Sequence, residues 1–157
     1  MAINWGSIKL AEDELISYII KEYGVQLIER AVGNQPYWDC KMANIDNVEK
    51  LIELKIDYMS ARTGNIAIEF RNSKKNIPSG INITKADVWS HAYVYEDAWH
   101  CMFVKVKDLK EYINNNPPHK IIFGGGDKNS DMYIYAIKDL RCNIGEHKFW
   151  KELTTKK

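Results

Sequence analysis

One segment of the chain alternates apolar and charged residues with the period of a β-strand. Residues 51–57 read Leu-Ile-Glu-Leu-Lys-Ile-Asp, so isoleucine and leucine alternate with two acids and a lysine. Because successive side chains of a strand point to opposite faces, the pattern predicts one apolar face and one charged face. The charged face carries Glu53, Lys55 and Asp57.

Other patterns predict helices and strands around this segment. Apolar residues at spacings of three and four predict a helix over residues 8–23 that ends at Gly24, whereas 25–32 fit either a strand or its continuation. Strands are predicted at residues 37–43, 48–59, 66–71, 93–95, 99–106, 120–123 and 132–137. Helices are predicted from Thr84 with Asp87 as its capping partner, at 107–114, and in the basic C-terminal end. These elements predict a mixed α/β architecture.

The predicted turn between the strands at residues 37–43 and 48–59 brings two acids together. If it centres on Asp46, Asp39 lies directly across from Glu53. Opposed residues in antiparallel strands have Cβ atoms about 5 Å apart, and two carboxylates at that distance repel unless a positive group separates them. Mg²⁺ would supply that charge, since it is commonly held by one or two carboxylates, water and substrate phosphate. Mn²⁺ is expected to substitute for it.

Lys55 lies on the same strand face as Glu53. A lysine beside two carboxylates stays protonated, so its expected role is to stabilise developing negative charge. Asp39, Glu53 and Lys55 therefore predict the catalytic core of a metal-dependent phosphodiester hydrolase. The alternative interpretation is an ordinary solvated strand face, on which Glu-x-Lys is common.

A second hairpin would add further acids to the same region. If it centres on Thr63, Asp57 lies across from Glu69 and Lys55 across from Arg71. Asp57 and Glu69 are therefore secondary candidates for a metal or supporting position. An equally good alternative is that Glu69 pairs with a nearby basic residue.

Composition adds broad limits. The chain has 157 residues, 45% of them hydrophobic and 27% charged, which predicts a single domain over residues 1–157 with a real core. A net charge of +1 means that nucleic-acid binding would depend on local basic patches. Three widely spaced cysteines predict no disulfide framework, so a reducing cytoplasm is expected. No signal peptide or membrane span is expected.

On these residues the sequence resembles the PD-(D/E)xK nuclease superfamily, in which a helix precedes an Asp on one strand and Glu-x-Lys on the next. The matching residues are Asp39 and Glu53-Leu54-Lys55, although Pro36 does not directly precede Asp39. The resemblance covers about residues 8–95. It implies a restriction-endonuclease-like fold, a mixed β-sheet flanked by helices, with Mg²⁺ dependence and cleavage of nucleic acid, DNA being the expected substrate.

The resemblance also implies a ligand set. The two carboxylates would be joined by the main-chain carbonyl of Leu54 and by an acid from the first helix. Glu14 is the best-placed helix acid, with Glu12 and Glu22 as weaker candidates. For each of these three, the alternative is a solvated helix side chain.

Polar residues downstream are candidates for contact with the DNA backbone. Lys74, Lys75, Ser79 and Lys85 could bind phosphate, because such side chains make most positioning contacts on DNA. Ordinary turn and cap roles explain them as well. Segments 63–69, 79–80 and 84–89 are similar to uncharacterised phage and bacterial nuclease-like proteins. If the protein is viral, its expected location is the cytoplasm of the host cell.

Two functional alternatives stay open. Small single-domain members of the superfamily resolve Holliday junctions as dimers, so a branched-DNA resolvase and a homodimer are consistent with the resemblance. The other alternative is a module that retains the fold, binds nucleic acid or protein, and has lost catalysis.

Overall fold

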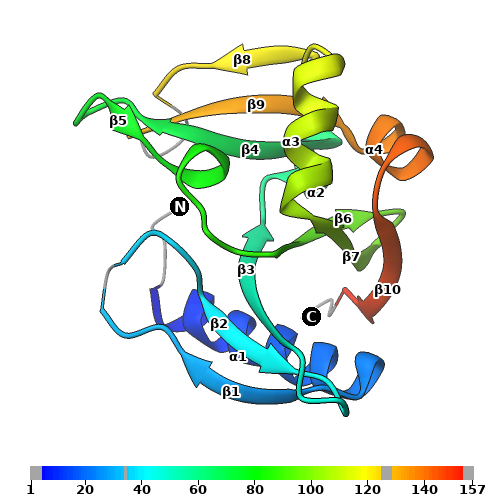
Figure 1. The fold of residues 1–157 in the computed structure, drawn as a ribbon. Coiled ribbons are helices and arrows are strands. Elements are labelled where there is room, and N and C mark those ends of the chain that lie inside the picture. The colour runs from blue at the N-terminus through cyan, green and yellow to red at the C-terminus, as the bar shows by residue number, and fades with distance from the viewer. Residues whose placement is uncertain (1–4, 34, 125–128, 154–157) are drawn as a thin grey trace.

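The computed structural model describes residues 5–33, 35–124 and 129–153 and has a mixed α/β architecture (Figure 1). The helices are α1 (Trp5–Tyr23), α2 (Ser60–Thr63), the 3₁₀ helix η1 (Gly80–Asn82), α3 (Val106–Asn115) and α4 (Ile137–Asn143). The strands are β1 (Gln26–Arg30), β2 (Cys40–Ala43), β3 (Glu49–Asp57), β4 (Asn65–Asn72), β5 (Ile77–Pro78), β6 (Val88–Tyr95), β7 (Ala98–Lys105), β8 (Lys120–Ile122), β9 (Ser130–Ala136) and β10 (Glu146–Glu152). Within the described ranges, no helix is both long and apolar enough to cross a membrane.

The strands form two sheets. The larger has the order β1-β2-β3-β6-β7-β10, and its neighbouring strands are antiparallel except β3 and β6, which are parallel. The smaller has the order β5-β4-β9-β8 and is antiparallel throughout. The chain reaches β6 only after passing through the smaller sheet, so β3 gains a parallel neighbour by a long crossover.

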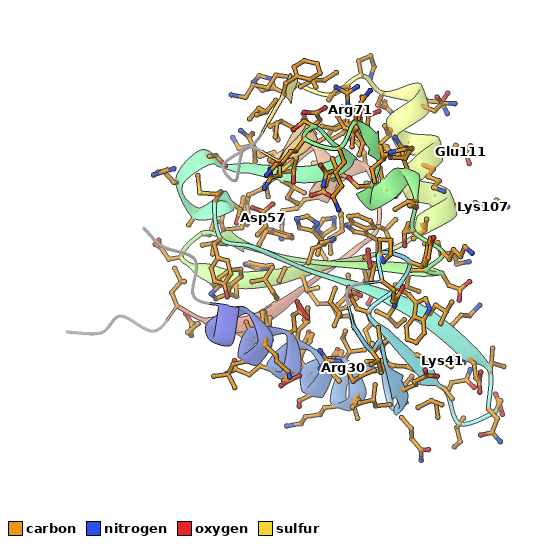
Figure 2. The ribbon with its side chains drawn as sticks, turned by 90° about the vertical axis from the view of Figure 1, so that its left-hand side faces the viewer. Arg30, Lys41, Asp57, Arg71, Lys107 and Glu111 are labelled. Carbon is orange, nitrogen blue, oxygen red and sulfur yellow. The ribbon has the colours of Figure 1, made fainter. Side chains whose placement is uncertain are left out.

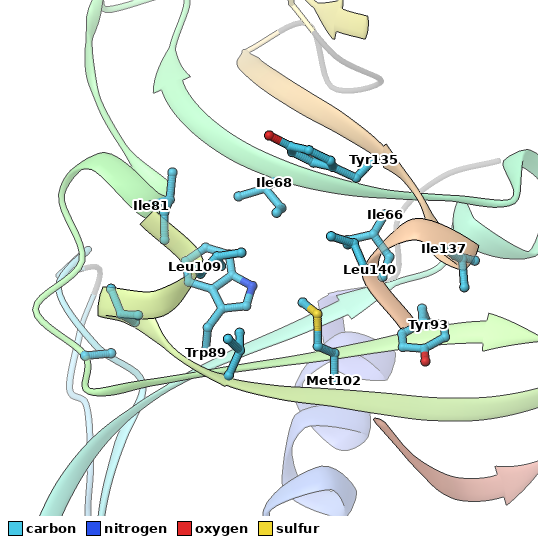
Figure 3. Packing of buried hydrophobic residues seen from close by; sticks show 13 residues of the cluster. Ile66, Ile68, Ile81, Trp89, Tyr93, Met102, Leu109, Tyr135, Ile137 and Leu140 are labelled. Carbon is cyan, nitrogen blue, oxygen red and sulfur yellow. The ribbon is translucent and has the colours of Figure 1, made fainter. Parts of the chain in front are cut away.

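The larger sheet is covered on both faces. On one face α1 contributes Leu15, Ile16 and Ile19 to a core with inward residues of β2, β3, β6 and β7. On the other face β6 and β7 pack against the smaller sheet, α3 and α4. Figure 3 shows Trp89 and Met102 pointing from the larger sheet toward the smaller one.

Charged residues of β3 therefore point into the interior. Ile52 and Leu54 face α1, as the predicted apolar face should. The opposite face, with Glu53, points toward the smaller sheet, and Glu53 is only 4% exposed. The solvated-face interpretation is wrong for Glu53, which the second layer buries, whereas the Lys55 side chain is 37% exposed.

Several local predictions are confirmed. Gly24 ends α1 with φ +63°, and its amide donates to the Ile20 carbonyl. Residues 26–30 are a strand, which resolves the ambiguity after the first helix. β6 and β7 form a hairpin whose turn residues, Glu96 and Asp97, both have positive φ, as a tight two-residue turn requires.

One predicted helix is wrong, and another is confirmed only in part. The Thr84 hydroxyl donates to the Tyr37 carbonyl, and the main chain of Asp87 hydrogen bonds to Leu51, so 84–87 runs extended along neighbouring segments. At the C-terminal end, residues 137–143 form the helix α4, but 146–152 form β10, which pairs with β7, and 154–157 lie outside the described residues.

The second predicted hairpin is also wrong. α2 and Gly64, with φ +70°, redirect the chain after β3, so β4 joins the smaller sheet and pairs with β5 and β9. Glu69 is opposite Met132, not Asp57, and Arg71 is opposite Asp131, not Lys55. Turn length alone did not show that the chain changes sheets here.

Candidate active site

Asp39, the residue before β2, lies beside Glu53 of β3, and the two carboxyl groups share a hydrogen bond. The Asp39 amide donates to the Ile52 carbonyl at 2.9 Å, and the ladder of β2 with β3 begins one residue later, with Cys40 opposite Ile52. This confirms the predicted register of the first hairpin. The Leu54 amide donates to Asp39 Oδ2 at 2.6 Å, which holds this carboxylate against the main chain of β3.

These side chains line a pocket of about 170 Å³. Its lining residues come from the segment before β2, from β3 and from the region between β4 and η1: Gln35, Pro36, Asp39, Glu53, Lys55, Glu69, Ser79 and Gly80. The walls therefore come from both sheets. A small polar recess with three acids and one lysine suits a compact charged group.

The Glu53 carboxyl is strongly perturbed. Burial raises its pKa, Lys55 lowers it, and the charge of Asp39 together with a hydrogen bond to that residue raises it further, to about 8. At neutral pH Glu53 is therefore mostly protonated, and its carboxyl can donate to the Asp39 carboxylate. Two acids sharing one proton form a place where a cation can substitute for that proton.

Lys55 contacts the same carboxyl. Its Nζ lies 3.8 Å from Glu53 Oε1, and its side chain is 37% exposed. Burial opposes its charge, but Glu53, Asp39 and Glu69 outweigh that effect and raise the pKa of Lys55. The ammonium is therefore the cation that the pocket itself provides.

Among the three candidate acids of the first helix, Glu12 is the one that the charges of Asp39 and Lys55 affect, and it also forms an ion pair with Arg30 at 3.7 Å. Burial and the nearby Asp39 carboxylate raise the pKa of Glu12, while Arg30 and Lys55 act in the opposite direction. Glu14 instead forms an ion pair with Lys151 at 2.5 Å.

Helical spacing explains why Glu12 and Glu14 have different neighbours. Glu12 lies three and four residues before Leu15 and Ile16, which are buried on the sheet-facing side of α1. Glu14 lies off this stripe. Glu22, the other weaker candidate, pairs with Lys148 at 2.8 Å.

The two secondary acids have different surroundings. Glu69 lines the pocket, although it arrives from the smaller sheet, and its Oε1 accepts a hydrogen bond from the Ser130 hydroxyl at 2.6 Å. Asp57 is not among the lining residues. Its Oδ2 accepts hydrogen bonds from His91 Nε2 at 2.9 Å and from the Ala67 amide at 3.0 Å. Figure 2 shows Asp57 between the two layers.

Of the predicted DNA contacts, the pocket includes Ser79. Its hydroxyl oxygen is buried and has no hydrogen-bond partner within the described parts of the chain. The Lys85 ammonium lies 4.6 Å from the centre of the Tyr37 ring, just beyond the Gln35–Pro36 wall. Lys74 and Lys75 are exposed in the turn that joins β4 to β5.

Sequence reasoning missed Gln35, Pro36 and Gly80 as lining residues. Gln35 and Pro36 belong to a turn, and nothing in their residue types indicates a site. At position 80 the residue type itself is informative, because the backbone requires glycine. Gly80 has φ +51°, and a Cβ there would lie 2.1 Å from the Glu69 carbonyl oxygen. Only glycine permits this close approach.

Comparisons with protein-family models, with curated proteins and with solved structures found no match to this chain.

Proposed function

We propose that the chain is a Mg²⁺-dependent nuclease that hydrolyses phosphodiester bonds, with DNA as the expected substrate. The observation that carries this proposal is the Asp39–Glu53 pair, whose carboxyl groups share a hydrogen bond, with the Lys55 ammonium 3.8 Å from Glu53. The long crossover that gives β3 a parallel partner is consistent with a restriction-endonuclease-like sheet.

The donor set is compatible with Mg²⁺. Among the residues that the structure describes, no group of three His, Cys, Asp or Glu side chains is arranged to hold a metal ion. Asp39 and Glu53 supply two carboxylates, which is the number Mg²⁺ usually takes from protein when waters and substrate phosphate complete its shell. The Leu54 carbonyl is the proposed main-chain ligand. Bound there, the ion would supply Lewis acidity and lower the pKa of a coordinated water.

The chain's own groups have distinct proposed roles. Asp39 is oriented by the Leu54 amide and Glu53 by burial, so both carboxylates need little reorganisation when a cation enters. Lys55 would stabilise negative charge on the phosphoryl oxygens. The Ser79 hydroxyl, which has no partner among the described residues, is the proposed contact to a phosphate oxygen.

The test is cleavage of labelled duplex, single-stranded and four-way-junction DNA and of RNA, with Mg²⁺, Mn²⁺ or EDTA. We expect cutting with either metal and none in EDTA. Glu53→Gln and Lys55→Met should each lower kcat by about 100- to 1000-fold, the usual loss when a charge-stabilising group is removed. Glu49→Gln, an exposed change on the same strand, should leave the rate unchanged.

The substrate panel also separates the alternatives. Preference for the four-way junction over linear duplex would make the protein a resolvase. Absence of cutting on every substrate with both metals would reject the nuclease proposal and leave a binding module.

A further inference from the structure

A line of hydrogen-bonded side chains runs through the interior beside the pocket. The Trp89 indole Nε1–H donates to His91 Nδ1 at 3.0 Å, and His91 Nε2 donates to Asp57 Oδ2 at 2.9 Å. Asp57 is anchored in turn by the Ala67 amide of β4. Because Nδ1 accepts from the indole, the proton of the neutral imidazole lies on Nε2, where the carboxylate accepts it.

This arrangement fixes the plane of the Trp89 ring. Trp89 is fully buried and His91 is 2% exposed, and their rings lie nearly parallel, with an interplanar angle of 18°. Trp89 also packs in the core with Ile68, Ile81 and Leu109 (Figure 3). Packing and hydrogen bonding together leave the indole one orientation.

The Lys55 ammonium lies over this ring. Its Nζ is 5.6 Å from the ring centroid, within the range of a cation–π interaction. The parallel register of β3 and β6 creates the contact, since it pairs Glu53 with Trp89 and Lys55 with His91. Lys55 therefore lies between the indole face and the Glu53 carboxyl.

We propose that Trp89 is a positioning residue for the Lys55 ammonium, and that Asp57 and His91 hold the indole in the orientation that this requires. A lysine side chain has four rotatable bonds, and leaving the ammonium free to move would weaken its action on a phosphate. The catalytic meaning of the contact rests on the proposed nuclease function. The position of the ammonium does not, and it can be measured without substrate.

The first test is NMR of protein labelled with ¹³C-lysine, with the Lys55 signals identified by their loss in Lys55→Met. We expect the Lys55 ε-methylene protons to be shifted upfield by the indole ring current relative to exposed lysines. The shift should be reduced in Trp89→Phe, which keeps an aromatic face, and absent in Trp89→Leu. Ordinary chemical shifts in the wild type, or shifts unchanged by Trp89→Leu in folded protein, would overturn the proposal.

The hydrogen-bonded line is tested separately with Asp57→Asn, which keeps the shape of the side chain. Loss of the charged acceptor should move the Trp89 indole N–H resonance and reduce the Lys55 ring-current shift. An unchanged Lys55 signal would show that Asp57 does not act through Trp89.

A third experiment measures kcat and KM for DNA cleavage by the wild type and by tryptophan variants. Trp89→Phe should lower kcat by about tenfold, the order expected from weakening a desolvated cation–π contact, with KM unchanged. The control is Trp99→Phe in the neighbouring strand, where Trp99 packs against Trp150 at 6.0 Å between ring centroids; this variant should leave kcat unchanged. Equal losses in both variants would overturn the positioning role. Absence of cleavage by the wild type would reject the nuclease proposal, while the NMR result still decides the position of Lys55.

Discussion

At the residue scale, the Glu53 carboxyl makes the protein sensitive to pH. Its pKa is raised from the ordinary 4.5 to about 8, first by burial and then, against the effect of Lys55, by Asp39. Between these two pH values the folded protein keeps a proton that the unfolded chain releases. The free energy of unfolding therefore falls as pH rises through this window.

Glu53→Gln should remove this dependence, because the amide fits the same space and does not titrate. In EDTA the variant should match the wild type near pH 4 and exceed it at pH 9 by a few kcal/mol, on the order of 1.4 kcal/mol per unit of pKa shift. Urea denaturation between pH 4 and about 9 measures this difference.

The exposed variant Glu49→Gln is the matched control on the same strand, and it should change stability by less than about 0.5 kcal/mol at every pH. Parallel stability profiles for the wild type and Glu53→Gln would contradict a buried, protonated carboxyl. Since Glu53→Gln is expected to be folded, its loss of cleavage would report on chemistry.

At the scale of elements, η1 and β4 meet without an intervening side chain. Gly80 places its Cα against the Glu69 carbonyl, and both residues line the pocket. The Ser79 amide donates to the Phe70 carbonyl, which continues the contact. The wall of the pocket thus depends on the close approach of two main chains.

Gly80→Ala should destabilise the protein by about 2–4 kcal/mol, because a methyl group 2.1 Å from a carbonyl oxygen forces the two segments apart at a positive φ. Gly64→Ala is the control, since Gly64 also has positive φ but a Cβ there meets nothing within 4 Å. It should cost only about 1 kcal/mol. Chemical denaturation compares the two, and equal losses would contradict the steric explanation.

At the scale of the whole molecule, the Tyr93 hydroxyl joins β6 to α4 and β10, whose contacting residues lie 48 and 54 positions away along the chain. It lies 2.7 Å from His147 Nδ1 on β10 and accepts a hydrogen bond from Arg141 on α4 at 2.8 Å. Burial lowers the pKa of His147, so its neutral ring can accept the Tyr93 proton while Nε2 faces the Leu140 and Ile144 carbonyls. The network attaches the C-terminal strand to the centre of the larger sheet.

Tyr93→Phe should therefore lower the free energy of unfolding by about 1–3 kcal/mol, since it leaves the partly buried Arg141 and His147 without these hydrogen bonds. Tyr58→Phe is the control, because Tyr58 is 48% exposed, and it should change stability by less than about 0.5 kcal/mol. Thermal or urea unfolding gives both values. A loss no greater than in the control would mean that the network does not stabilise the attachment of β10.

The sequence by itself determined the local parts of this protein. A helical stripe predicted α1, and strict alternation predicted β3. A short turn then set the register of β2 and β3, in which Cys40 is opposite Ile52 as predicted, and Asp39 and Glu53 come together just beyond that pair. Such features follow from residues that are close along the chain, because side-chain period and turn length are local properties.

Only the tertiary structure decided which distant segments meet. β3 has β6, not β4, as its neighbour, and this exchange directs Asp57 to His91 and brings Trp89 under Lys55. Glu69 reaches the pocket from the smaller sheet, and the register of the predicted hairpins did not indicate this. The alternation of apolar and charged residues shows that a strand has two different faces. It does not specify which strand or layer will cover each face, because that depends on non-local packing.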